Sequence, residues 1–147
     1  MTGPQPFSGT VWRAMVAGAD PLAPVRSPEG RFHHGGQWAI YSSLTAQGCA
    51  VAIARYLRAD DPPRVVVPLS VTLQVINHTG QPALSVVWQD LRASGGLPPT
   101  WAHSDNARAA GAQGLLYSSR SRPDLTHLVL FDAAAIRAAG APRPFPA

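Results

Sequence analysis

A stretch of fourteen residues, "GRFHHGGQWAIYSS" (30–43), gathers side chains that can bind a charged ligand. Arg31 follows Gly30 on an expected loop, where a guanidinium can hold a phosphate pair through two parallel hydrogen bonds. Trp38 and Tyr41 are three residues apart, so on a strand their rings face opposite sides. One ring is expected in the core, and the other can offer its π-face to a base or a nicotinamide ring. The alternative is that Arg31 is a solvated loop charge and both rings are core.

A second polar stretch, "GLLYSSRSRPDLTHLVLF" (114–131), lies near the end of the chain. An expected strand ends there in Tyr117-Ser118-Ser119-Arg120, so hydroxyls and a guanidinium gather where a sheet edge meets a loop. Serine hydroxyls at such a point can hydrogen-bond a ribose or a phosphate. The alternative is that these residues only form a turn, because Ser, Arg, Pro and Asp are common in loops.

Several other chemistries lack their sequence motifs. His33 and His34 are adjacent and rarely aim at one ion from such positions, and no acid or cysteine follows at a ligand spacing, so we expect no metal. Neither a GxSxG nucleophile elbow nor a GxxxxGK[ST] phosphate loop occurs. The single cysteine, Cys49, excludes an internal disulfide framework.

The elements that must position these residues alternate irregularly along the chain. Strands are expected at 11–15, 38–43, 65–69, 70–76, 114–119 and 127–131, with Pro68 at an edge or a bulge. Helices are expected at 45–57, at 82–91, at 105–110 with Ser104 as its cap, and from Asp132 to 137. Such a mixture without a βαβ rhythm predicts an α+β domain, with a mixed or antiparallel sheet and flanking helices.

Length and composition limit the class of protein. At 147 residues, 46% hydrophobic and 14% charged, residues 1–147 are expected to form a single domain, with a core at about 11–137 and a tail at 142–147. All twelve positive charges are arginines, and the net charge of +4 permits an acidic partner. The arginines are scattered without interleaved aromatics, so direct binding of nucleic acid is not expected.

No apolar run approaches the roughly 20 residues that span a bilayer, so no membrane association is expected. The start, "MTGPQPFSGT", has neither the basic region nor the apolar region of a secretion signal. The cytoplasm is therefore the expected location.

Three stretches together resemble one known family, over about Val11 to Phe131. They are "VWRA", then "GRFHHGGQWAIYSS" before an alanine-rich helix, and "GLLYSSRSRPDLTHLVLF". The chain resembles the RES-domain family, named for an arginine, a glutamate and a serine. The resemblance implies a fold similar to ADP-ribosyltransferases and the toxin of a bacterial type II toxin–antitoxin system. It implies consumption of NAD⁺ as the substrate, without a metal, by a glycohydrolase, a phosphorylase or a mono-ADP-ribosyltransferase with a protein target. It also implies a cognate antitoxin with an Xre-type helix-turn-helix domain.

The resemblance assigns roles to three residues, which are the expected catalytic set. Arg31 matches the family arginine, which would bind the NAD⁺ phosphates. Tyr41 matches the tyrosine after it, which would stack against nicotinamide. Ser119 best matches the family serine, with Ser118 as the alternative.

Two further residues complete the expected NAD⁺-binding set of Arg13, Arg31, Tyr41, Ser119 and His127. Arg13, in "WRA", matches a less constant arginine that would face the same pocket. His127, or Thr126 before it, stands where the family usually has an asparagine, and its imidazole can take a polar role there.

The chain departs from the family at the glutamate. That residue belongs at about 52–55, but the helix there reads "GCAVAIARYL" and contains no acid. A carboxylate at this place would stabilise the positive charge that develops on the ribose as nicotinamide leaves. Glu29, beside the Arg31 loop, is the one glutamate available. The alternative function is therefore a catalytically impaired module that keeps the fold and binds its antitoxin or a nucleotide without turnover.

Overall fold

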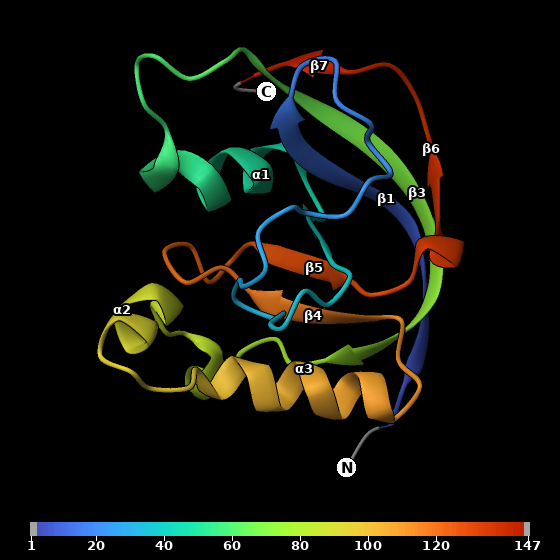
Figure 1. Cartoon of the computed structure of the whole chain (residues 1–147). Helices are drawn as coiled ribbons and strands as arrows, with labels where there is room; N and C mark the ends of the chain where they lie inside the picture. The colour runs from blue at the N-terminus through green and yellow to red at the C-terminus, as the bar shows by residue number, and fades with distance from the viewer. Residues whose placement is uncertain (1–2, 146–147) are drawn as a thin grey trace.

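Seven strands and three α-helices follow one another along residues 3–145, the part of the chain that the computed structural model describes (Figure 1). The strands are β1 (Gln5–Val16), β2 (Ile40–Ser43), β3 (Arg64–Asn77), β4 (Gly114–Ser118), β5 (Thr126–Leu130), β6 (Ile136–Ala138) and β7 (Arg143–Pro144). The α-helices are α1 (Ala46–Ile53), α2 (Trp88–Ala93) and α3 (Pro99–Ala109). Three short 3₁₀ turns are η1 (Ala54–Tyr56), η2 (Pro82–Leu84) and η3 (Ala133–Ala135).

The strand pairings form a ring. β1 pairs with β3 antiparallel along its whole length, β3 pairs with β4 in parallel, and β4, β5 and β2 follow antiparallel. β2 returns to β1 through one residue pair, Trp12 with Ser43. β6 and β7 lie along the other side of β3. The predicted α+β domain with a mixed sheet is confirmed.

Side chains along β4 and β5 alternate between two apolar cores. Leu116 and Leu128, a cross-strand pair, face a first core that includes residues of β1 and β3. Leu115 and Val129, the neighbouring pair, face a second core that includes Phe32 and residues of α3. Successive side chains on a strand point to opposite faces, so each strand serves both cores.

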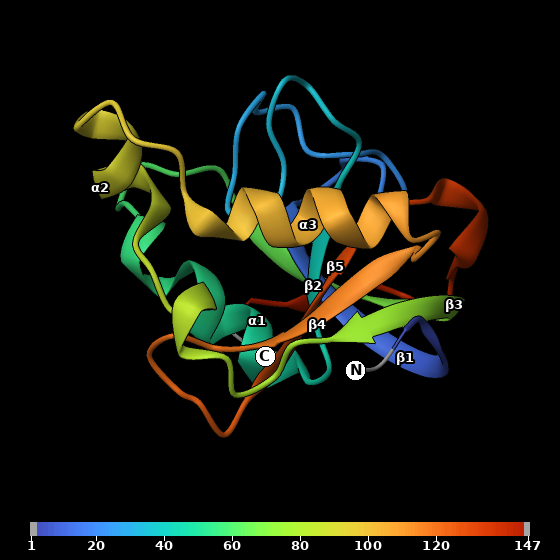
Figure 2. The ribbon, with the colours of Figure 1, turned by 90° about the horizontal axis from the view of Figure 1, so that it is seen from below.

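The helices flank the strands. Figure 1 draws α1 above β5 and α3 beneath β4, and Figure 2 shows α3 running across the strands. α1 contacts β1 and β2, and α3 contacts β4. Within residues 3–145, no helix is long and apolar enough to cross a membrane.

Several expected elements occur close to their predicted places. The strands expected at 11–15, 38–43, 114–119 and 127–131 correspond to β1, β2, β4 and β5, although β1 starts six residues earlier, at Gln5. The helix expected over 45–57 corresponds to α1 followed by η1. Thr45 caps it, because its Oγ1 accepts a hydrogen bond from the backbone N–H of Gly48 (3.0 Å).

One long strand, β3, replaces the two strands expected at 65–69 and 70–76. Pro68 lies within it, opposite Trp12 of β1. On the other side of β3, Pro68 falls in the gap between β7 and β6. Its carbonyl oxygen accepts a hydrogen bond from Ala139 N (3.2 Å) on that side. The missing N–H of Pro68 therefore costs no bond to β1, and the strand continues.

The helix expected over 82–91 is divided. η2 ends at Leu84, Val87 has an extended backbone (φ −91°, ψ 95°), and α2 begins at Trp88. Val86 and Val87 separate the two turns, because their branched side chains disfavour a helix.

The short helix expected over 105–110 begins earlier, at Pro99. Ser104, its expected cap, lies inside α3, and its hydroxyl donates to the carbonyl oxygen of Trp101 (3.1 Å). Pro99 occupies the first turn, where its missing N–H leaves no helical bond unmade. The Pro98-Pro99 pair therefore starts a helix.

The end of the chain is more regular than expected. Asp132 does cap a turn, accepting from Ala134 N (2.9 Å), but the turn is η3 and the chain becomes β6 at Ile136. The expected helix to 137 is therefore wrong: pairing with β3 buries Ile136 and outweighs the helix preference of the alanines. The tail expected from 142 contains β7, and its residues 146–147 lie outside the described residues.

Candidate functional site

One cavity of about 640 Å³ lies among α1, the loop around Arg31, the segment before α2 and the ends of β2, β4 and β5. All five expected site residues lie on its wall: Arg13, Arg31, Tyr41, Ser119 and His127. Its volume falls in the range of about 300 to 1,000 Å³ that is usual for small-molecule sites.

A row of paired residues on β2, β5 and β4 forms one side of the cavity. Ser43 lies opposite His127, and His127 lies opposite Tyr117. Directly paired residues share a face of the sheet, and Tyr41 shares it too because it is two residues from Ser43. The second core packs on this same face of the sheet. The side chains of the face are apolar in the core and more polar beside the cavity. Trp38 packs instead against the first core.

The Arg31 guanidinium is packed against other side chains. It lies 4.8 Å from the ring centroid of Tyr117 and 5.4 Å from that of Phe32, and Nη2 donates a hydrogen bond to the carbonyl oxygen of Leu84. Its buried Nε has no hydrogen-bond partner among the described residues. Burial lowers the pKa of Arg31 and nearby Arg120 lowers it further, although Tyr117 opposes them. A solvated loop charge, the alternative for Arg31, does not describe this packing.

The Tyr41 hydroxyl is committed to the Arg31 loop. It accepts a hydrogen bond from Phe32 N (2.9 Å) and lies 2.7 Å from Nδ1 of His33, whose Nε2 lies 2.8 Å from the carbonyl oxygen of Ser27. Because a carbonyl oxygen only accepts, Nε2 carries the proton of His33 and Tyr41 donates to Nδ1. Burial lowers the pKa of His33 and raises the pKa of Tyr41, so both groups are neutral at pH 7. Tyr41 packs against the second core and also lines the cavity.

Of the two serines left open by the sequence, Ser119 lines the cavity. Its backbone N–H donates to the carbonyl oxygen of Leu125 (2.9 Å), and its Oγ accepts from Arg122 N (3.2 Å). The hydroxyl proton of Ser119 is therefore free to be donated. Ser118 is turned elsewhere, and its Oγ accepts from Gly80 N (2.9 Å).

Arg13 supports the loop that forms another part of the wall. Its Nη1 donates to the carbonyl oxygens of Pro21 (2.8 Å) and Ala23 (2.6 Å). Burial lowers the pKa of Arg13, and Asp20 opposes the shift. Arg13 therefore both lines the cavity and fixes the chain around it.

His127 is 4% exposed and lies at the centre of the row of paired residues. Its Nδ1 is 2.5 Å from Oγ of Ser43, and its ring centroid is 5.3 Å from that of Tyr117. Burial, and then the charge of Arg31, lower the pKa of His127 to about 4. The imidazole is therefore neutral at pH 7.

The charge around the cavity is strongly positive. Glu29 is the only carboxylate among the described residues that line it, and α1 supplies no acid. Both oxygens of Glu29 are held by Arg92, which donates from Nε (3.1 Å) and Nη2 (3.2 Å). The lining arginines are Arg13, Arg31, Arg55, Arg64 and Arg120. This excess of guanidinium groups favours an anionic ligand.

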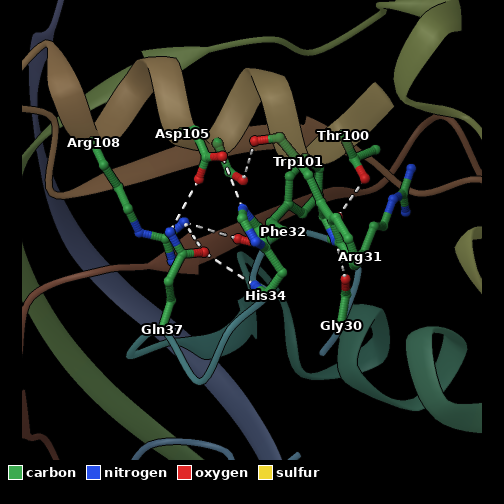
Figure 3. Close-up of polar contacts among 10 residues, drawn as sticks. Gly30, Arg31, Phe32, His34, Gln37, Thr100, Trp101, Asp105 and Arg108 are labelled. Carbon is green, nitrogen blue, oxygen red and sulfur yellow. Dashed lines mark hydrogen bonds and ion pairs between the residues drawn. The ribbon is translucent and has the colours of Figure 1, made fainter. Parts of the chain in front are cut away.

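Helix α3 holds the backbone of the Arg31 loop (Figure 3). Trp101 Nε1 donates to the carbonyl oxygen of Gly30 (2.8 Å), and the Thr100 hydroxyl donates to that of Arg31. Arg108 donates from Nη1 to the carbonyl oxygen of Phe32 (3.1 Å). Three consecutive carbonyl groups of the loop are thus bound by side chains of one helix, which fixes where the Arg31 side chain starts.

The same helix also binds side chains of the loop. Asp105 accepts hydrogen bonds from Gln37 Nε2 (3.0 Å) and from His34 Nε2 (2.8 Å), as Figure 3 shows. The His34 ring stacks on Trp101, with centroids 4.7 Å apart. His34 therefore points to α3 while His33 points to Tyr41. Within residues 3–145, no group of three or more His, Cys, Asp or Glu is placed to hold a metal ion.

Sequence reasoning missed this role of α3. Trp101, Asp105 and Arg108 follow the spacing i, i+4, i+7, which places them on one face of a helix. The spacing becomes visible only if the helix begins at Pro99, and the expected start at Ser104 concealed it. Arg55 and Arg64 were also missed, since scattered arginines carry no spacing that predicts a shared cavity, whereas Arg120 belongs to the polar stretch expected at the end of β4.

Comparisons with known proteins agree with this fold. A family model described as the RES domain matches residues 10–147. No curated protein matches the chain. The structure is similar to a chain in the crystal structure of the M. tuberculosis MbcT–MbcA toxin–antitoxin complex, with a TM-score of 0.62 and 21% sequence identity. The match covers 97% of this chain and 84% of that chain. At this identity, the likeness concerns the fold.

Proposed function

Because the chain belongs to the RES-domain family, we propose that it is the toxin of a bacterial toxin–antitoxin pair that consumes NAD⁺ in its cavity. Arg31 holds the diphosphate, Tyr41 stacks on nicotinamide, and Ser119 hydrogen-bonds the ribose or the nicotinamide amide. Arg13 and His127 complete the binding site. The reaction takes place in the cytoplasm, without a metal.

One observation carries this proposal: Arg31, Tyr41 and Ser119, from both ends of the chain, line a single cavity of about 640 Å³. The positive lining suits a diphosphate, and guanidinium groups bind its oxygens through paired hydrogen bonds.

The proposed chemistry is the departure of nicotinamide. The glycosidic bond breaks through an oxocarbenium-like state, and water, phosphate or a protein side chain captures the ribose carbon. Arg31 stabilises the diphosphate throughout, while the neutral Tyr41 ring packs on the leaving group. Glu29 offers little charge stabilisation, because Arg92 holds both of its oxygens.

Incubation of the purified protein with NAD⁺, followed by chromatography for free nicotinamide, tests the proposal. We expect release by the wild type and by the control Arg137→Gln, because Arg137 is exposed on β6 and outside the cavity. We expect at least tenfold less release by Ser119→Ala. No release by the wild type, with or without cell extract, would contradict NAD⁺ consumption.

The second candidate function is a module that binds its antitoxin or a nucleotide without turnover, and the lack of an acid on α1 favours it. Calorimetric binding of NAD⁺ without nicotinamide release, together with no growth arrest on expression, would select this function.

A gain-of-function variant separates the two functions further. Ala52 is exposed on α1 and lines the cavity, so Ala52→Glu places a carboxylate where the family has its glutamate. We expect nicotinamide release to rise at least tenfold if charge stabilisation limits an active site. Gln47→Glu, on the same helix but outside the cavity, is the matched control.

The proposed partner is a cognate antitoxin with an Xre-type helix-turn-helix domain. The likeness to a chain from a toxin–antitoxin complex supports an antitoxin as the partner. Co-expression with the product of a neighbouring helix-turn-helix gene should relieve growth arrest and yield a complex on gel filtration.

A further inference from the structure

We propose that His127 is the general base that takes the proton from a hydroxyl acceptor, water above all, as this acceptor attacks the ribose carbon. This role rests on the proposed consumption of NAD⁺. It gives one residue of the cavity wall a part in proton transfer, which binding of NAD⁺ alone does not require.

His127 is the imidazole with a free nitrogen at this site. Two histidines line the cavity among residues 3–145, His33 and His127. Both ring nitrogens of His33 are engaged, one by Tyr41 and one by the carbonyl oxygen of Ser27. His127 uses Nδ1 for Ser43, and its Nε2 makes no hydrogen bond to another described residue. A group that accepts a proton from a ligand needs such a free nitrogen.

The role of base requires one tautomer of His127, and the groups behind the ring allow it. The Cys49 thiol donates to the carbonyl oxygen of Trp12 (2.7 Å), so its sulfur can act only as an acceptor towards Ser43. Ser43 lies close enough to this thiol to influence the pKa of Cys49. As the proposed base, His127 holds its proton on Nδ1 and donates it to Oγ of Ser43, 2.5 Å away. Nε2 is then the unprotonated nitrogen, with its lone pair free for a proton.

The step balances as follows. The C–N glycosidic bond breaks, and its electron pair leaves with nicotinamide. The acceptor oxygen forms a bond to the ribose carbon and gives its proton to Nε2 of His127, which becomes an imidazolium and later releases the proton to solvent. With water as the acceptor, the products are nicotinamide, ADP-ribose and one proton.

The groups around His127 keep it neutral before the step. Arg31 lies near it, and Tyr117 and Ser43 flank it on the neighbouring strands, with Cys49 behind Ser43. Burial raises the pKa of both Cys49 and Tyr117 to about 12, so neither changes charge near pH 7. The diphosphate of a bound dinucleotide, held by Arg31, would offset the positive charge that disfavours the imidazolium.

The test compares two acceptors in the wild type, in His127→Asn and in the control His103→Asn. His103 lies on α3 against His78, outside the cavity. Hydrolysis of NAD⁺ needs a base, whereas exchange of nicotinamide for 3-acetylpyridine does not, because the pyridine nitrogen has no proton to lose. We expect His127→Asn to lower kcat for hydrolysis by about 100-fold or more, while exchange changes less than threefold. His103→Asn should leave both rates unchanged.

A second variant tests the tautomer. Ser43→Ala removes the acceptor of Nδ1–H, so hydrolysis should fall about tenfold while exchange persists. The acid limb in the pH profile of wild-type hydrolysis should also disappear in His127→Asn.

Retained exchange shows that a variant is folded and still releases nicotinamide. An equal loss of hydrolysis and exchange in His127→Asn would overturn the role of base. Release of nicotinamide by the wild type only with added phosphate dianion would also overturn it, because the dianion needs no base. The absence of both release and exchange in the wild type would overturn the proposed function itself, and the inference with it.

Discussion

The guanidinium of Arg31 lies 4.8 Å from the ring centroid of Tyr117, which is itself fully within the second core. A desolvated contact of this kind contributes up to about 2 kcal/mol. A ring quadrupole holds a cation in place but does not neutralise it as a carboxylate would. The cavity therefore keeps a positioned positive charge that an anionic ligand can use.

Arg31→Gln should weaken the binding of NAD⁺ by about 10- to 100-fold, because it removes the charge and half of the bidentate donor set. The corresponding loss of roughly 1.5–3 kcal/mol is usual for a hydrogen bond to a charged group. Isothermal titration calorimetry on folded protein measures it. Arg137→Gln, the exposed control, should bind as the wild type does, and equal affinities for all three proteins would contradict the role of Arg31.

Arg108→Ala should lower the free energy of unfolding by roughly 2–3 kcal/mol. The variant leaves the carbonyl oxygens of Phe32 and Trp38 without this donor and removes a cation–π contact at 4.0 Å from Phe131. Urea unfolding measures the change, with Arg137→Ala as the control, which should stay within about 0.5 kcal/mol of the wild type. A similar small effect for Arg108→Ala would show that α3 does not hold the loop.

Gly30→Ala should destabilise the protein by about 1–3 kcal/mol and reduce NAD⁺ binding. An added Cβ would lie 2.3 Å from Cε1 of His33 and 2.8 Å from the hydroxyl oxygen of Tyr41, so the two side chains must move apart. Gly3→Ala is the matched control, because nothing lies within 4 Å of its Cβ. Thermal unfolding together with calorimetry should separate the two variants, and wild-type behaviour of Gly30→Ala would contradict the packing described.

Stability should fall as the pH is lowered from about 6.5 to about 4. Burial and Arg31 lower the pKa of His127 from 6.5 to about 4, so in this window the unfolded chain binds a proton that the native protein does not. The loss approaches about 3 kcal/mol at 1.36 kcal/mol per pKa unit. The lowered pKa of His33 also makes the folded protein less stable as the pH falls.

Urea unfolding at pH 7, 5.5 and 4.5 measures this dependence. His127→Asn should show a clearly shallower loss than the wild type, since it lacks the buried imidazole. The same slope in both proteins would place the titrating group elsewhere.

The parts of the fold that depend on local pattern could be predicted. The short runs rich in apolar and aromatic residues over β2, β4 and β5, and the four-residue spacing around Cys49, were sufficient to place those elements. The elements whose form depends on distant pairing could not. Pro68 reads as an interruption until β6 and β7 are known to leave a gap beside it, and Ile136 turns extended because β3 pairs with it.

The candidate site divides in the same way. Arg31, Tyr41 and Ser119 could be proposed to share a cavity, because the stretches that hold them resemble the RES-domain family. Ser43 could have been added, since it lies two residues from Tyr41 and shares its face. The pairing of Glu29 with Arg92, 63 residues away, has no local pattern that predicts it.

The pairing around the ring of strands is uneven. β1 pairs with β3 along its whole length, but with β2 through the single residue pair Trp12 and Ser43. The shortest pairing of the ring thus lies beside the cavity, which Arg13 of β1 and Tyr41 of β2 both line. A ligand that needs a wider pocket would therefore have to separate one residue pair of the sheet, with the pairing of β1 and β3 intact.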